Sequence, residues 1–131
     1  MSDIGKSLHI SWNELRCKDG TPYPAEFISD GRIIELVVMF ERIRFVINEP
    51  LIINSAYRTV SYNKRVGGSP KSQHLLGKAL DIQAPKNMSA ALFFEILKER
   101  HEEFGIRGLG KYKTFCHCDI RDSDKLITWE G

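Results

Sequence analysis

The segment SQHLLGKALD, residues 72–81, joins a polar loop to an apolar strand. Its end alternates as a strand does, so that Leu80 and Ile82 share one face while Asp81 projects from the other. His74 stands seven residues before Asp81, where the loop ends. The segment therefore predicts a core strand with a carboxylate on its second face and a histidine beside its start.

A second strand with the same arrangement is predicted in FCHCDIR, residues 115–121. Cys116 and Cys118 lie on one face of this strand, and His117 lies on the other. Two thiols around a histidine also invite a zinc-binding interpretation, but the pattern favours small apolar thiols turned toward a core. With Cys17 the chain has three cysteines, and an odd number argues against a disulfide framework.

The remaining pattern predicts an α+β fold with a small antiparallel sheet and helices packed on one of its faces. Strands cluster late in the sequence, where Gly105, Gly108 and Gly110 are interpreted as breakers that end a helix. The predicted elements are an irregular arm (8–20), a helix from Ser29 to about Ile47, a strand (51–55), a loop with one helical turn near Tyr62–Val66, a strand (78–84), a helix capped by Asn87 or Ser89 that runs to about Phe104, a strand (115–121) and an edge strand (125–129).

Length and composition fit one globular domain over residues 1–131. The chain is 42% hydrophobic and 27% charged, which is ordinary for this class. Its net charge of +2 does not point to nucleic acid, which would need Lys64, Arg65 and Lys71 to form a continuous basic stripe. No apolar run is long enough to span a membrane, and the N-terminus does not resemble a secretory signal. We therefore expect a cytoplasmic protein, or release by another route.

His74, Asp81 and His117 together form a candidate metal site. Two imidazoles and one carboxylate are a common ligand set for catalytic Zn²⁺, with the fourth position left to water. Such an ion polarises a carbonyl and lowers the pKa of its water to about 7. Spacing alone leaves alternatives to a metal site open. A lone histidine is often structural, and an aspartate inside a strand often lies at a sheet edge without binding a metal.

The sequence also resembles a known family over nearly its whole length. Ser72, His74, Gly77, Ala79 and Asp81 fit every position of the SxHxxGxAxD signature of zinc D-alanyl-D-alanine peptidases, the peptidase M15 family, which shares its fold with the Hedgehog signalling domain. The segment SAYRTVSYNKRVGGSPKSQHLLGKALDI, which begins upstream of this signature, resembles the small M15 domains of phage and bacterial cell-wall enzymes. ISWNELRCKDG resembles their N-terminal arm, and GLGKYKTFCHCDIRD resembles their closing strand.

The resemblance implies roles for particular residues. His74, Asp81 and His117 would be the three zinc ligands, with Zn²⁺ as the cofactor. Arg58 matches an arginine that faces the substrate in relatives, and its planar charged group suits a developing oxyanion. The alternative is a surface arginine on a loop.

Further contacts to ligands or substrate are expected from polar and aromatic side chains near these positions. Ser72 and Gln73 would hydrogen-bond ligands or substrate, although Ser72 could equally be a turn residue. Four aromatic residues would line a substrate groove, although aromatic residues more often belong to a core: Tyr57, Tyr62, Tyr112 and Trp129.

One part of the family pattern is missing. Many members carry an acidic general base in an ExxHxH pattern, but the residue three before His117 is Thr114. The nearest carboxylate is Asp119, two residues after His117 and therefore on the same strand face. We interpret Asp119 as the general base, or as the group that orients the attacking water. An ion pair with Arg121, on the same face, is an equal alternative.

The resemblance implies a zinc-dependent metallopeptidase that hydrolyses amide bonds in peptidoglycan stem peptides, as a murein endopeptidase or a D,D-carboxypeptidase. We favour an endopeptidase such as a phage lysin, which waits in the cytoplasm before it acts on the cell wall. We expect a monomer whose partner is the peptide substrate. The missing glutamate leaves a second hypothesis open, namely a zinc-bearing wall-binding or virion protein of the same fold without turnover.

Overall fold

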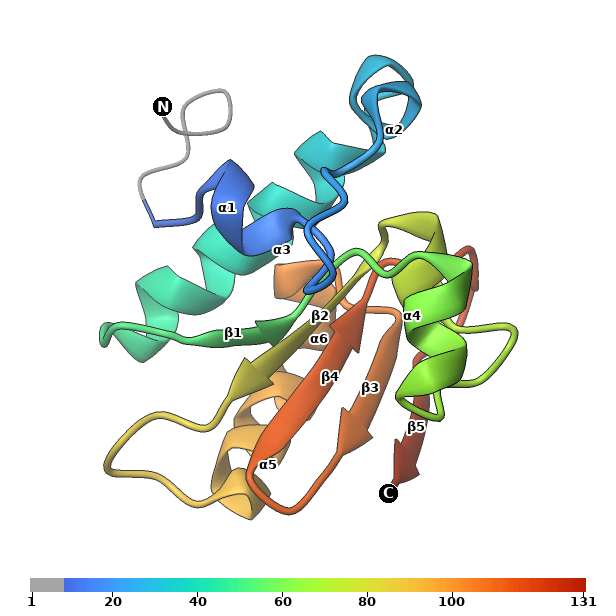
Figure 1. The fold of residues 1–131 in the computed structure, drawn as a ribbon. Coiled ribbons are helices and arrows are strands. Elements are labelled where there is room, and N and C mark those ends of the chain that lie inside the picture. Colours follow the sequence, from blue (N-terminus) through green and yellow to red (C-terminus); the bar gives the residue numbers. More distant parts are fainter. Residues whose placement is uncertain (1–8) are drawn as a thin grey trace.

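A five-stranded sheet, in the order β1-β2-β4-β3-β5, forms the centre of the molecule (Figure 1). The computed structural model describes residues 9–131. The predicted α+β class is confirmed, and neighbouring strands are antiparallel except for β3 and β5. The strands are β1 (Ile53–Ser55), β2 (Ala79–Gln83), β3 (Gly108–Lys111), β4 (Phe115–Asp119) and β5 (Ile127–Glu130).

The parallel pair follows from the route of the chain after β4. Asp119, the last residue of β4, lies opposite Gly108, the first residue of β3. The chain then turns and begins β5 at Ile127, which also lies opposite Gly108. Because both strands start at the same level, β5 runs in the same direction as β3. The sheet departs from the expected antiparallel arrangement at this edge alone, within the described residues.

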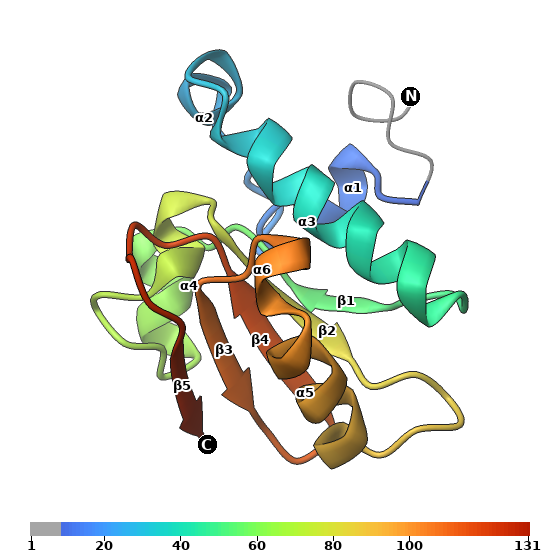
Figure 2. The same cartoon turned by 180° about the vertical axis from the view of Figure 1, so that it is seen from behind.

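Helices cover one face of the sheet and border a cleft on the other. Three of them, α3, α5 and α6, lie across the face seen in Figure 2, whereas α4 and η1 lie toward the face seen in Figure 1. The helices are α1 (Trp12–Leu15), α2 (Ala25–Ser29), α3 (Arg32–Ile47), α4 (Val60–Arg65), the 3-10 helix η1 (Gln73–Leu76), α5 (Ala90–Glu99) and α6 (His101–Phe104).

Local sequence explains where the helices begin and end. The helix expected from Ser29 to about Ile47 is α3, which begins three residues later, at Arg32, because Gly31 adopts a left-handed conformation with φ 86°. Ser29 is instead the last residue of the separate helix α2. Ser89 caps α5 by accepting the backbone N–H of Leu92 at 3.0 Å. Ser11 caps the single turn α1, which interrupts the arm expected to be irregular.

The apolar face of the sheet packs against these helices. Leu80 and Ile82 of β2 and Cys116 and Cys118 of β4 are fully buried there, as the alternation predicts. All three cysteines are free and buried, which confirms the interpretation of residues 116 and 118 as core-facing thiols. Burial raises the pKa of the Cys116 thiol to about 12, so this thiol stays protonated at neutral pH.

The sequence pattern does not predict strand β3, because Gly108 and Gly110 resemble helix breakers. A Cβ atom on Gly108 would overlap the carboxylate of Asp119, and one on Gly110 would overlap the indole of Trp129. The two glycines thus keep one face of β3 bare. That bare face leaves room for side chains of β4 and β5 to lie over the strand.

Among the residues that the structure describes, no helix has the length and apolar character needed to cross a membrane. The expectation of a missing secretory signal depends on the start of the chain. Residues 1–8 of that segment lie outside the described range.

Candidate metal centre

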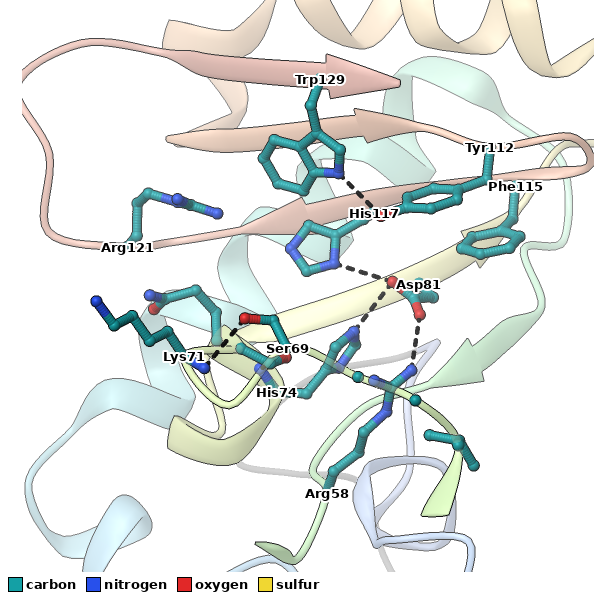
Figure 3. A pocket seen from close by; sticks show the side chains of 15 residues that line it. Arg58, Ser69, Lys71, His74, Asp81, Tyr112, Phe115, His117, Arg121 and Trp129 are labelled. Atoms are coloured by element: carbon teal, nitrogen blue, oxygen red, sulfur yellow. Dashed lines mark hydrogen bonds and ion pairs between the residues drawn. The ribbon is translucent and has the colours of Figure 1, made fainter. Parts of the chain in front are cut away.

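The pairing of β2 with β4 brings two of the three predicted ligands together. Asp81 and His117 are register partners, and their side chains project from the face opposite the core. Asp81 Oδ1 lies 3.0 Å from His117 Nδ1 (Figure 3). Both side chains are buried, so their contact is shielded from water.

His74 reaches the same point from the short helix η1. Ser72 Oγ accepts the backbone N–H of His74 at 3.1 Å and starts this turn, so the turn role considered for Ser72 is the one its contacts show. Gly77 ends the turn in a left-handed conformation with φ 66°. His74 Nδ1 donates to the carbonyl oxygen of Ala56 at 2.6 Å. Its Nε2 therefore faces Asp81 Oδ1, at 3.1 Å.

His117 is held from behind by Asp119. Its Nε2 donates to Asp119 Oδ2 at 2.7 Å, because an ionised carboxylate can only accept. Nδ1 is thereby turned toward Asp81. Arg121 completes the arrangement: its Nε donates to Asp119 Oδ1 at 2.9 Å, and its Nη2 donates to Oδ2 at 2.7 Å.

Three atoms with lone pairs consequently converge on one point: His74 Nε2, an Asp81 carboxylate oxygen and His117 Nδ1. These ligand atoms lie within 4.8 Å of one another, and all three residues are buried. Acceptors that face each other in a buried place need a cation between them, either a proton or a metal ion. Two imidazoles whose remaining nitrogens are already hydrogen-bonded, together with one carboxylate, fit a catalytic zinc site.

Burial and hydrogen bonding act in opposite directions on these groups. Burial lowers the pKa of His74, which keeps its imidazole neutral as a metal ligand must be. Burial raises the pKa of Asp81, but its contacts with the imidazoles of His117 and His74 outweigh burial and hold that pKa below its usual range. Burial lowers the pKa of His117, but its bonds to Asp119 and Asp81 outweigh it and raise that pKa. The raised pKa favours the protonated form of His117 in the metal-free protein.

Arg58 points into the centre from the segment after β1. Its Nε donates to Ser55 Oγ at 3.1 Å, its Nη1 donates to Asn63 Oδ1 at 3.2 Å, and its Nη2 lies 3.4 Å from Asp81 Oδ2. Asn63 is buried and in turn donates to the carbonyl oxygen of Ser69 at 2.8 Å. These contacts fix the guanidinium beside the ligands, and its role toward substrate stays a prediction.

Asp119 does not face the cleft. Its side chain is 0% exposed, and both carboxylate oxygens are engaged by His117 and Arg121. It lies beyond the Nε2 atom of His117, whereas Asp81 lies beyond Nδ1. The contacts show the ion pair with Arg121, which is the alternative interpretation of Asp119. A general base must reach the attacking water, and the position of Asp119 does not suit that role.

An open cleft of about 530 Å³ passes over the centre, within the usual size range of ligand sites. One wall consists of the stacked rings of Tyr112 and Phe115, whose centroids lie 4.7 Å apart, and of Trp129. Trp129 Nε1 donates to the Tyr112 hydroxyl at 2.9 Å (Figure 3). The other side of the cleft is lined by the segment 66–73, which includes Gln73.

Like Tyr62, the predicted groove residue Tyr57 does not line this cleft. Its ring packs edge-on against Tyr23 and Phe27, with centroid separations of 6.2 and 6.0 Å. This aromatic cluster lies against Gly77 and so supports the turn that carries His74. Tyr57 therefore has a packing role against the core, which is the alternative expected for an aromatic residue.

Sequence reasoning missed the two side chains that hold Arg58, Ser55 and Asn63. Ser55 ends a strand, and Asn63 lies in the single helical turn of a polar segment. Polar residues in such places are normally solvated, so no local pattern marks them as buried partners of an arginine. Their importance appears only in the folded chain, where Arg58 contacts both of them.

Comparison with known families gives one match. A family model described as peptidase M15 matches residues 8–119. The matched range includes η1, β2 and β4, and therefore all three candidate ligands, and it ends before Arg121 and Trp129. The comparison with curated proteins gave no match.

Proposed function

Because the chain belongs to the peptidase M15 family, we propose that it is a zinc-dependent metallopeptidase that hydrolyses amide bonds in peptidoglycan stem peptides. The observation that carries the proposal is the convergence of two imidazole nitrogens and one carboxylate oxygen in an open cleft. The donor set fits zinc, and the cleft is large enough for several peptide residues.

Each part of the cleft would have a defined task. When bound, zinc would supply a Lewis acid for the scissile carbonyl and a lowered pKa for water. Arg58 would present its guanidinium to the oxygen that gains negative charge, and Ser55 and Asn63 already hold it in that orientation. The wall of Tyr112 and Trp129 would contact the peptide on its apolar side.

An endopeptidase fits the open cleft better than a carboxypeptidase does, because a cross-linked peptide continues on both sides of the cleaved bond. A lysin that is made in the cytoplasm and later meets the cell wall is the biological setting that we favour. Products of digestion distinguish the two activities, since a carboxypeptidase releases single terminal amino acids.

One observation favours a second candidate function. In the described part of the chain, Asp81 is the only carboxylate that lines the cleft, and it is one of the ligands. Asp119 is buried behind His117. Without a further acidic side chain to accept a proton from water, the protein would bind stem peptides at a metal centre and release them unchanged. It would then be a wall-binding or virion module.

Digestion of purified peptidoglycan, followed by mass spectrometry of the muropeptides, tests the proposal. We expect new free amino groups with zinc-loaded protein, their loss with a chelator, and recovery when zinc is added back. His74→Ala should be inactive, whereas the matched control His101→Ala, on α6 outside the cleft, should retain activity. Zinc binding without cleavage would favour the binding module, and absence of zinc binding would contradict both candidates.

A further inference from the structure

We propose that Asp119 is a positioning residue that selects Nδ1 of His117 as the metal-binding atom and holds the imidazole in that orientation. The inference rests on the proposed metal centre and concerns what fixes its third ligand. An imidazole has two nitrogens, and either can bind a metal ion when the other carries the proton. Something in the fold must therefore decide between them.

The contacts of Asp119 determine which nitrogen of His117 is free to bind a metal ion. The carboxylate accepts from His117 Nε2 at 2.7 Å, which places the proton on Nε2 and leaves Nδ1 facing Asp81 at 3.0 Å. The same carboxylate accepts the backbone N–H of Arg121 at 3.0 Å and both ends of its guanidinium fork. Because all these bonds come from one side chain that is 0% exposed, Asp119 cannot turn away from the ring.

Two further residues close the arrangement around His117. The Arg121 guanidinium lies over the ring of Trp129, 5.1 Å from its centroid. The Trp129 ring in turn lies beside His117, with centroids 5.1 Å apart. Arg121 and Trp129 follow residue 119, where the family match ends, so this part of the support comes from the last segment of the chain.

Gly108 supplies the space in which Asp119 sits. It is the register partner of Asp119 across β3 and β4. A Cβ atom at this position would overlap both carboxylate oxygens of Asp119 and come within 2.5 Å of Arg121 Nε. Because Gly108 has no side chain, the buried carboxylate of Asp119 fits over β3. The glycine is needed there to make space for Asp119.

Two measurements on the full chain with zinc alone test the inference. The first is ¹⁵N NMR of the His117 side chain, which reports the nitrogen that binds the metal and the one that carries the proton. We expect Nδ1 bound and Nε2 protonated in the wild type. Metal coordination through Nε2 would overturn the inference without the use of any variant.

The second measurement is zinc affinity, by competition with a chromophoric chelator. Asp119→Ala should bind zinc about 10–100-fold more weakly, as is typical when the partner of a ligating histidine is lost. Asp119→Asn keeps an oxygen that can accept from Nε2, so it should recover part of that loss. Asp124→Asn, an exposed carboxylate before β5, is the matched control and should bind zinc as the wild type does.

The outcomes separate this inference from the proposed function. If the wild type binds no zinc, the metal centre itself is wrong and the inference falls with it. If the wild type binds zinc and folded Asp119→Ala binds it equally well through Nδ1, the metal centre stands and the positioning role is wrong. Far-UV circular dichroism of the metal-free variants identifies those that are folded. The NMR result on the wild type decides the case if Asp119→Ala does not fold.

Discussion

Asp81 and His117 face each other across the β2–β4 ladder, and Asp81 Oδ1 lies 3.0 Å from His117 Nδ1. The same oxygen lies 3.1 Å from His74 Nε2. One carboxylate oxygen is thus shared by two imidazoles from different segments. Two ligands are fixed by the register of a sheet, which is rigid, and the third is added by the turn η1. The geometry of the centre is set largely before any metal ion binds.

Asp81→Asn should abolish stable metal binding while leaving the fold intact. The amide keeps the volume of the carboxylate but removes its charge, and one of its two heavy atoms becomes a donor. We expect zinc affinity to fall by more than the roughly 10–100-fold that is typical when a residue hydrogen-bonded to a metal ligand is lost. Elemental analysis after dialysis measures the bound metal. Asp122→Asn, an exposed residue after β4, is the control, and full zinc occupancy in Asp81→Asn would show that Asp81 is not a ligand.

Arg58→Lys should reduce turnover without removing the metal. Lysine carries the charge but cannot keep the separate bonds from Nε and Nη1 to Ser55 and Asn63. We expect kcat to fall by roughly 10²-fold, as for the loss of a group that stabilises developing charge, with zinc content unchanged. Arg65→Lys, on the exposed side of α4, is the matched control. A parallel loss of zinc and activity would mean that Arg58 acts through its contact with Asp81 instead.

The ligand set was accessible from sequence because alternation is a local property. Residues 80 and 82 are apolar and residue 81 is not, so the side on which Asp81 projects follows from the strand alone. The same argument places His117 opposite two buried cysteines. Sequence could not show that these strands pair in a register that makes Asp81 and His117 partners, because register depends on both strands and their connections.

The role of Asp119 shows where such reasoning ends. Its separation from His117 places both on one strand face, and the structure agrees. The nitrogen of the His117 ring that contacts Asp119 depends on where the carboxylate lies. Arg121 binds that carboxylate, and Gly108 leaves space for it. Arg121 is only two residues from Asp119, but Gly108 comes from another strand, β3. A glycine that looks like a helix breaker in sequence is therefore a spacing residue in the folded site.

Gly77→Ala should destabilise the protein more than the matched variant Gly31→Ala. Both glycines have positive φ, 66° and 86°, so both substitutions carry a backbone cost of about 1–2 kcal/mol. At Gly31 a new methyl group meets no atom within 4 Å, whereas at Gly77 it would lie 2.6 Å from Phe27 and 2.9 Å from the Tyr23 hydroxyl. Urea unfolding measures the difference. Equal losses would mean that the aromatic cluster yields easily, and zinc affinity should then also be unchanged in Gly77→Ala.

Acid should destabilise the metal-free protein partly through Asp119. Burial raises the pKa of this carboxyl, but hydrogen bonds from His117 and Arg121 outweigh burial and lower the pKa to about 2. In the unfolded chain its pKa is about 3.9. Between these values the unfolded state binds more protons, so the free energy of unfolding falls as the pH falls. The contribution is complete above about pH 5 and amounts to roughly 2 kcal/mol, lost by about pH 2.

Urea unfolding of metal-free wild type and Asp119→Asn at a series of pH values isolates this contribution. Asp81 also has a lowered pKa, but it is present in both proteins and cancels in the difference. His117 titrates at higher pH because its pKa is raised, so the comparison is made below about pH 5, where its imidazole is charged whether folded or unfolded. The stability difference should then shrink by roughly 2 kcal/mol between about pH 5 and about pH 2. A difference that stays constant over this range would mean that Asp119 is not held as an anion between His117 and Arg121, and the orientation of the His117 ring would need another cause.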